Sequence, residues 1–205
     1  IRNFDVNHDG TDVCYGLLTG YPCCTSNMHQ GWPKFTQNLW YATNDGGLAA
    51  LVYSPSTVKA FVAAGTAVSV NEETAYPFGE SVQFTLQVDN KNKAAAFPFH
   101  LRIPAWCKKA VIKINGKIWE EPYGGRIIKI DREWKSGDIV ELVLPMHIFK
   151  NTWYENSVSI ERGPLVYALK IGEEAKKVKN DKDPVAYGNS YLELRPTTPW
   201  NYGLY

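Results

Sequence analysis

The chain has 205 residues, of which 44% are apolar, enough to build a hydrophobic core. Its net charge of +1, from 22 basic and 21 acidic residues, argues against a dedicated nucleic-acid binder, which usually carries a basic stripe. No run of about 18 apolar residues occurs, so we expect no membrane-spanning helix. The chain begins at Ile1 without an initiator Met, and its last residues read as a segment that continues. We therefore expect a processed protein or a piece of a longer one.

One helix is predicted, from near Asn27 to near Thr43. Asn27, or the serine before it, can cap its start. Trp32, Phe35 and Leu39 fall at i, i+3 and i+7, on one face of a helix, where aromatic residues usually pack in the interior rather than line a sugar site. The following Asn-Asp-Gly-Gly run accepts positive φ and ends the helix.

From Gly47 onward the apolar residues alternate with polar ones, which predicts strands. Asn115-Gly116 is a strong hairpin signal. Strands at this spacing indicate a mainly β chain folded as a β-sandwich. Residues 173–183 are charged and are expected to form a solvated loop. The predicted strands are Leu48–Tyr53, Ala67–Asn71, Ser81–Val88, Phe97–Ile103, Ala110–Ile114, Lys117–Trp119, Arg126–Ile130, Ile139–Leu144, Ser157–Glu161 and Leu165–Ile171.

The four cysteines include an adjacent pair, Cys23-Cys24. Such a pair can be two buried core residues, a strained vicinal disulfide, or two thiolate ligands of one metal. Zinc requires about four ligands, and neither Cys14 nor His29 stands at a standard zinc-finger spacing from the pair. We interpret Cys14 as structural, Cys107 as a core residue and His29 as a polar residue at the helix start.

Several motifs carry a family resemblance. Tyr21-Pro22-Cys23-Cys24-Thr25-Ser26-Asn27 followed by Tyr41–Leu48 resembles the end of the catalytic domain of glycoside hydrolase family 127, the β-L-arabinofuranosidases. Leu101–Trp106, Trp134–Asp138 and Leu144-Pro145-Met146 resemble the β-sandwich that follows that domain, and Glu161–Ala168 resembles a further block of the family. The resemblance covers nearly the whole chain.

The resemblance implies a zinc-dependent retaining glycosidase that acts on β-L-arabinofuranosides or a related plant-glycan sugar. Cys23 would be nucleophile and zinc ligand, and Cys24 a second ligand. The acid/base, a Glu ligand and a further Cys ligand would precede Ile1, in an upstream segment of the catalytic domain. We expect residues 1–44 to end an (α/α)6-barrel catalytic domain, 45–147 to form a β-sandwich, and 148–205 to begin a second, incomplete one.

The alternative function is a non-catalytic β-sandwich module that binds carbohydrate or supports a neighbouring domain. What precedes Ile1 would distinguish the two. Glu72-Glu73 and Glu120-Glu121 make poor catalytic pairs, because adjacent strand residues face opposite ways. We expect a carbohydrate partner and no nucleic-acid partner. A thiolate site favours the cytoplasm or a zinc-loaded periplasmic enzyme of a bacterium.

Overall fold

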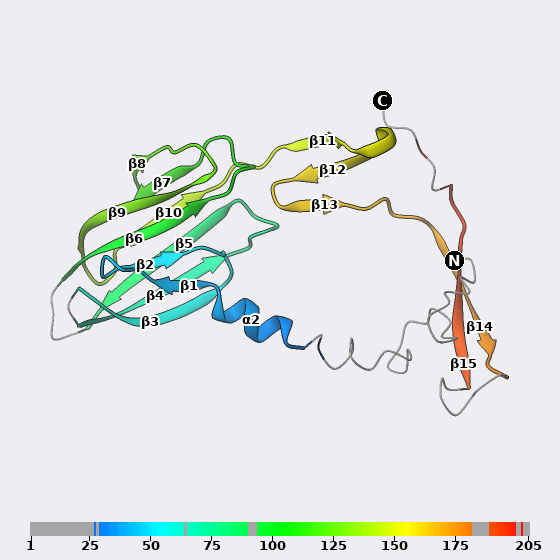
Figure 1. Ribbon diagram of the computed structural model, residues 1–205, viewed down its shortest axis with the longest axis horizontal. Coiled ribbons are helices and arrows are strands. Elements are labelled where there is room, and N and C mark those ends of the chain that lie inside the picture. Colours follow the sequence, from blue (N-terminus) through cyan, green and yellow to red (C-terminus); the bar gives the residue numbers. More distant parts are fainter. Residues whose placement is uncertain are drawn as a thin grey trace. The chain divides into compact units, whose positions relative to one another are not determined.

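The chain divides into two compact units, Lys34–Tyr167 and Ile1–Pro33 with Ala168–Tyr205. The first holds a β-sandwich and a three-stranded sheet, and the second holds a two-stranded ribbon (Figure 1). The fold is mainly β, as the sequence predicts. The residues described by the computed structural model are 27, 29–63, 65–89, 94–181, 189–199 and 202.

The sandwich consists of two sheets, one with strand order β1-β2-β6-β9 and the other with order β3-β4-β5-β10-β7-β8. Neighbouring strands are antiparallel except β2 and β6, which run parallel with Leu48 opposite Phe99. The first sheet comprises β1 (Trp40–Ala42), β2 (Leu48–Ala50), β6 (Ala95–Ile103) and β9 (Arg126–Trp134). The second comprises β3 (Ser56–Val62), β4 (Thr66–Thr74), β5 (Ser81–Val88), β10 (Ile139–Val143), β7 (Val111–Ile114) and β8 (Lys117–Glu120).

The core lies between these two sheets and is built on aromatic rings. Phe84 of β5 and Phe99 of β6 are fully buried, with ring centroids 5.2 Å apart in an edge-to-face arrangement. The buried Trp134 of β9 donates its Nε1–H to the carbonyl of Phe97 at 2.9 Å, so its polar atom is satisfied. Burying each such side chain contributes about 1.5–3 kcal/mol. The period-two pattern therefore works as expected, with one apolar face per strand turned to the facing sheet.

The hairpin signal is also confirmed. Asn115 and Gly116 connect β7 to β8, and both have positive φ, 51° and 78°. The Asn115 side chain donates to the Asp138 carboxylate at 2.8 Å and accepts the Ile139 amide at 2.8 Å. The turn residue thus also ties the hairpin to the start of β10.

The helix is shorter than predicted. α2 spans Gly31–Gln37, and Trp40 lies in strand β1, opposite Ala50. The Asn38 side chain donates to the carbonyl of Lys34 at the end of the helix. The Trp40 ring then stacks on Phe99, with centroids 5.9 Å apart. Tertiary packing of this indole outweighs the helical spacing that predicted continuation to Thr43.

The predicted interior face of that helix is wrong as well, since α2 has no buried residue. Trp32 is 74% exposed, and Leu39, which is buried, lies beyond the helix. The helical spacing of Trp32, Phe35 and Leu39 therefore grouped two exposed helix residues with a buried residue that lies outside the helix. Within the described residues no helix is long and apolar enough to cross a membrane.

Strands outside the sandwich correct the sequence interpretation once more. The charged stretch expected to be a solvated loop is strand β14 (Glu173–Lys179), paired with β15 (Ser190–Pro196). Most of its side chains are exposed, so composition predicted the exposure and missed the backbone pairing. The remaining sheet contains β11 (Ile148–Thr152), the 3-10 turn η1 (Tyr154–Asn156), β12 (Val158–Arg162) and β13 (Leu165–Tyr167).

The turn between β1 and β2 brings two backbones very close together. A Cβ placed on Gly47 would lie 2.0 Å from the carbonyl oxygen of Pro98 in β6. Gly47→Ala should therefore push β2 from β6 and destabilise the sandwich by about 1–3 kcal/mol. A Cβ on Gly31 meets nothing within 4 Å, so Gly31→Ala is the control. Thermal melts followed by near-UV circular dichroism would contradict the close approach if both variants melted together.

Candidate functional site

The two predicted site residues, Cys23 and Cys24, lie outside the described residues, as does Cys14. Just beyond them, the Gln30 amide donates to the carbonyl of Asn27 at 3.0 Å, and the Gln30 side chain donates to Asn27 Oδ1 at 2.8 Å. His29 is exposed in this turn. The assignment of the cysteine pair as nucleophile and ligands therefore stays a prediction.

Cys107 behaves as the core residue that the sequence predicts. Its side chain is fully buried, and its amide donates to the carbonyl of Pro104 at 3.1 Å. Burial raises the pKa of the Cys107 thiol, which disfavours a thiolate. Within the part of the chain that the structure describes, no group of three or more His, Cys, Asp or Glu residues is arranged to hold a metal ion.

The motifs that resemble the sandwich of the family make hydrogen bonds that join strands and close turns. In Leu101–Trp106, the Arg102 side chain donates from Nε to the carbonyl of Leu51, and the Arg102 carbonyl accepts the hydroxyl of buried Tyr53 at 2.5 Å. In Trp134–Asp138, the Asp138 carboxylate accepts the Lys135 amide at 2.9 Å. These residues close turns and join strands, so they position the fold rather than carry chemistry.

The Glu161–Ala168 motif fastens the three-stranded sheet to the sandwich. Arg162 Nη2 lies 2.8 Å from Glu80 Oε1, and Arg162 Nη1 donates to the carbonyl of Phe78 at 3.3 Å. The same Glu80 oxygen accepts the Met146 amide at 3.2 Å. Gly163 packs against Met146 so closely that a Cβ would lie 2.6 Å from its sulfur. The motif thus fixes the exit from β10.

A charged cluster surrounds the β1–β2 turn. The Asp45 carboxylate lies 3.1 Å from His100 Nε2 and 3.2 Å from Lys129 Nζ. A hydrogen bond from the Thr43 hydroxyl, helped by the contacts with Lys129 and His100, lowers the pKa of Asp45 to about 2. A carboxyl with so low a pKa is ionised at neutral pH and cannot donate a proton to a leaving group.

Glu72 has the opposite environment. It is 1% exposed, and its side chain points between the sheets, whereas neighbouring Glu73 is exposed. Its two oxygens accept the Ser54 amide at 3.0 Å and the Ser56 hydroxyl at 3.1 Å, and Trp40 Nε1 donates to that hydroxyl at 2.9 Å. Burial raises the pKa of Glu72 to about 7.

Neither pair of adjacent glutamates forms a catalytic pair, as the sequence predicts. Glu72 and Glu73 face opposite sides of β4, as the alternation predicts. Both Glu120 and Glu121 are exposed, and Glu121 lies 3.0 Å from Lys109 in an ion pair. A raised pKa is typical of acid/base residues, yet Glu72 is enclosed in the core, where a buried polar network serves packing.

Comparison with known proteins identifies the family to which this sandwich is similar. Residues 47–146 match the family model of the GH127 middle domain of β-L-arabinofuranosidases. This part of the chain is a GH127 middle domain. The matched residues run from Gly47, just before β2, to Met146, just after β10, so the GH127 middle domain covers most of the sandwich.

Individual relatives agree with this assignment. The chain is 24% identical over 177 residues to the non-reducing end β-L-arabinofuranosidase of Bifidobacterium longum subsp. longum. The aligned stretch covers 80% of this chain and 25% of that protein. A solved GH127 β-L-arabinofuranosidase from Geobacillus stearothermophilus T6 has a TM-score of 0.64 at 23% identity, over 95% of this chain and 33% of that chain. A solved glycoside hydrolase has a TM-score of 0.67 at 24% identity, over 95% and 35%. The chain thus spans about a quarter to a third of these relatives, and the structural likeness shows the fold.

Sequence reasoning missed two further features of the described residues. The buried carboxylate of Glu72 was read only as half of a poor pair, although its place in the inward register of β4, after Val68 and Val70, signals burial. Strand β3 was not predicted, although Thr57, Lys59 and Phe61 alternate with Val58, Ala60 and Val62.

Proposed function

We propose that the protein carrying this chain is a glycoside hydrolase that cleaves β-L-arabinofuranosides with retention, with Cys23 as its nucleophile. The observation that carries the proposal is the match of residues 47–146 to the GH127 middle domain, over a sandwich that the structure builds from the same residues. The adjacent Cys23 and Cys24, which precede α2 in the sequence, would supply the nucleophile and two metal ligands.

The Cys23 thiolate would attack the anomeric carbon while a carboxylic acid gives its proton to the leaving oxygen. Water would then attack the same carbon, pass its proton to the carboxylate and release the thiolate. Two inversions give net retention, as in enzymes that use a carboxylate nucleophile. We place the acid upstream of Ile1, as the family resemblance implies. Among the described carboxyls, Asp45 is held ionised and Glu72 is enclosed in the core.

The donor set of the pair suits zinc in kind and falls short in number. Two thiols are typical zinc ligands, but a protein site requires three or four protein ligands. Cys23 and Cys24 would hold the metal together with ligands from outside this chain. When bound, zinc would keep both thiols deprotonated at neutral pH. The role of Cys24 is then to anchor the metal beside Cys23.

The test compares the complete protein with this chain alone on an aryl β-L-arabinofuranoside. We expect the complete protein to release the aryl alcohol and initially to form the β-anomer of arabinose. We expect the 205-residue chain to release none, because we place the acid partner outside it. Rapid turnover by the chain alone would contradict the placement of the acid, and an inactive, folded complete protein would contradict the proposed function.

A further inference from the structure

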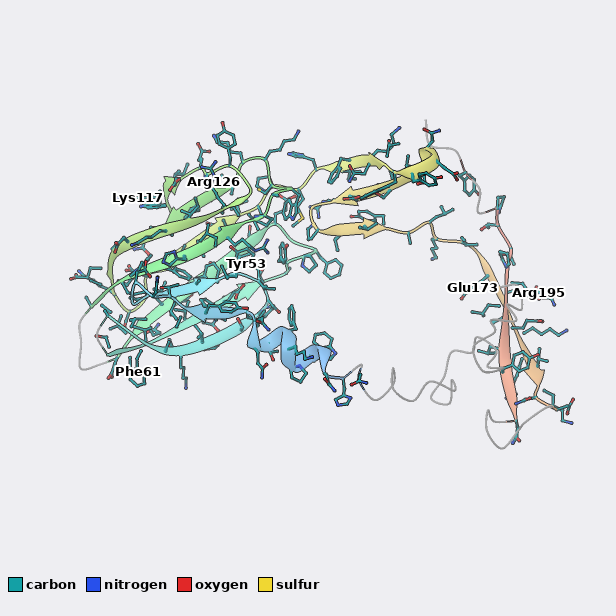
Figure 2. The ribbon with its side chains drawn as sticks, viewed as in Figure 1. Tyr53, Phe61, Lys117, Arg126, Glu173 and Arg195 are labelled. Carbon is teal, nitrogen blue, oxygen red and sulfur yellow. The ribbon has the colours of Figure 1, made fainter. Side chains whose placement is uncertain are left out.

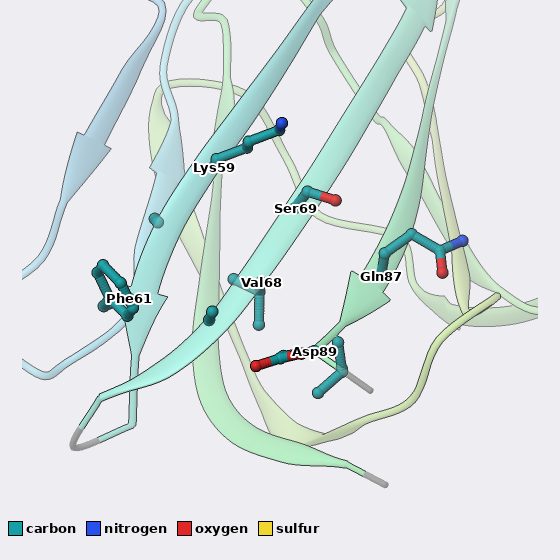
Figure 3. A pocket seen from close by; sticks show the side chains of 9 residues that line it. Lys59, Phe61, Val68, Ser69, Gln87 and Asp89 are labelled. Carbon is teal, nitrogen blue, oxygen red and sulfur yellow. The ribbon is translucent and has the colours of Figure 1, made fainter. Parts of the chain in front are cut away.

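The outer face of the six-stranded sheet carries a shallow groove across β3, β4 and β5, with a volume of about 510 Å³ (Figure 3). This size falls within the range of about 300–1,000 Å³ that is common for small-molecule sites. We call it the β3–β5 groove and define it by Lys59, Phe61, Ala67, Ser69, Gln87 and Asp89.

The strand register places the polar side chains of the β3–β5 groove in a row. Lys59 pairs with Ser69, and Ser69 pairs with Gln87, so the three residues lie side by side on adjacent strands. Adjacent strands are about 4.8 Å apart, so the row spans roughly 10 Å. Lys59, Ser69 and Gln87 point to the same side of the sheet (Figure 3). They form a flat row that offers an ammonium, a hydroxyl and an amide.

The next row holds the apolar part of the groove. Phe61 pairs with Ala67, and the Asp89 amide donates to the Ala67 carbonyl at 2.9 Å. The methyl group of Ala67 leaves the space beside the phenyl ring open. Phe61 is 80% exposed, whereas Tyr53 lies among the strands and is 2% exposed (Figure 2). One exposed aromatic residue is ordinary, so the polar row beside it carries the argument.

The hydrogen-bonding side chains of the β3–β5 groove are unused within the described residues. The side chains of Lys59, Ser69, Gln87 and Asp89 make no hydrogen bond or ion pair there. The neighbouring row differs, because Thr57 Oγ1 donates to Asn71 Oδ1 at 2.8 Å. Farther along the same sheet, Lys113 lies 3.3 Å from Glu141. The neighbouring Thr57–Asn71 pair is therefore satisfied, whereas the polar side chains of the groove are free for a ligand among the described residues.

We propose that the β3–β5 groove is a carbohydrate-binding subsite that takes a neutral pentose oligosaccharide. The hydroxyls of a sugar both donate and accept hydrogen bonds, which matches the mixed amide, hydroxyl, ammonium and carboxylate groups. The C–H face of a sugar ring packs on the electron-rich face of a phenyl ring. The opposite charges of Lys59 and Asp89 cancel, which favours a neutral ligand over a phosphate. The choice of arabinofuranose as the sugar rests on the proposed function.

The experiment titrates the 205-residue chain with a trisaccharide of β-linked L-arabinofuranose by calorimetry. We expect saturable binding, weakened about tenfold in Phe61→Ala, because the ring loses its apolar contact. Ala67→Trp should block the groove and abolish binding. Ile118→Ala is the matched control, because Ile118 is also exposed and apolar but lies in β8, the opposite edge strand of the same sheet. It should bind as the wild-type chain does, and melting curves should show all three variants folded.

Absence of binding at millimolar trisaccharide, or equal affinity of folded Phe61→Ala and the wild-type chain, would overturn the subsite. Neither result touches the proposed function, which is measured by aryl arabinofuranoside hydrolysis in the complete protein. Conversely, binding that depends on Phe61 in a protein that cleaves no arabinofuranoside would uphold the subsite and contradict the hydrolase.

Discussion

Cys23→Ser in the complete protein should abolish the hydrolysis of an aryl β-L-arabinofuranoside, with a fall in kcat of roughly 10³-fold or more. A serine hydroxyl stays protonated at neutral pH and is a poor nucleophile unless a base activates it, whereas a cysteine thiol is readily held as thiolate. Only the covalent step needs the thiolate. The variant should therefore show a large fall in kcat and only a small change in KM. The measurement is the split of kcat and KM between wild type and variant.

Two further variants separate chemistry from metal loss and misfolding. Cys24→Ser should lower the zinc content measured by elemental analysis, since one thiol ligand is lost. Cys107→Ala should leave kcat unchanged, because this thiol is buried in the sandwich core and has a raised pKa. Near-normal turnover by a zinc-loaded Cys23→Ser variant would contradict the thiolate mechanism and require a carboxylate nucleophile.

The sandwich was predictable because its strands follow the simplest rule of sheet burial. β5 alternates strictly, with Val82, Phe84, Leu86 and Val88 turned inward, and its observed bounds match the predicted ones. The Asn115-Gly116 turn was equally clear, since both residues adopt the positive φ that this dipeptide favours. In these segments the local pattern and tertiary packing agree.

Prediction failed where long-range packing decides the local structure. Trp40 lies within the predicted helix, but stacking on Phe99, some 59 positions away, draws it into a strand. Strand β14 depends on pairing with β15, where Glu174 lies opposite Arg195 and Lys176 opposite Glu193. Complementary charges support such a pair, yet β14 alone contains no apolar alternation. A one-dimensional pattern does not reveal partners this remote.

The candidate site was predictable only through motif resemblance, because the cysteine pair carries no standard metal spacing of its own. The groove was not predicted at all. Its parts belong to three strands, one of them unpredicted, and only the register aligns Lys59, Ser69 and Gln87. Surface sites formed across strands depend on register, which is set by the inward residues between them.

Glu72→Gln should remove a pH dependence of stability between about pH 4.5 and pH 7. In the folded chain burial raises the pKa of Glu72 from 4.5 to about 7, so the folded state holds this proton more tightly than the unfolded state. The contribution of Glu72 is therefore fully present below about pH 4.5 and is lost as the pH rises through 7. A shift of this size corresponds to up to about 3 kcal/mol in the free energy of unfolding.

The phenol of Tyr53, which interacts with Glu72, does not titrate in this pH range. Burial raises the pKa of Tyr53, so this phenol stays neutral. The hydrogen bonds from Ser54 and Ser56 favour the carboxylate but are outweighed by burial. No cation lies within ion-pair distance of Glu72 among the described residues, so the ionised form is only partly compensated.

Urea unfolding at pH 5 and pH 8 measures this effect. The wild-type chain should lose stability from pH 5 to pH 8 relative to Glu72→Gln by about 2–3 kcal/mol, and the variant should be at least as stable as wild type at pH 8. Glu73→Gln is the matched control, because this neighbouring carboxyl is exposed on the same strand. If Glu72→Gln and Glu73→Gln followed one pH profile, the buried carboxyl would not titrate near neutrality, and the Trp40–Ser56–Glu72 chain of hydrogen bonds would hold a permanently ionised group.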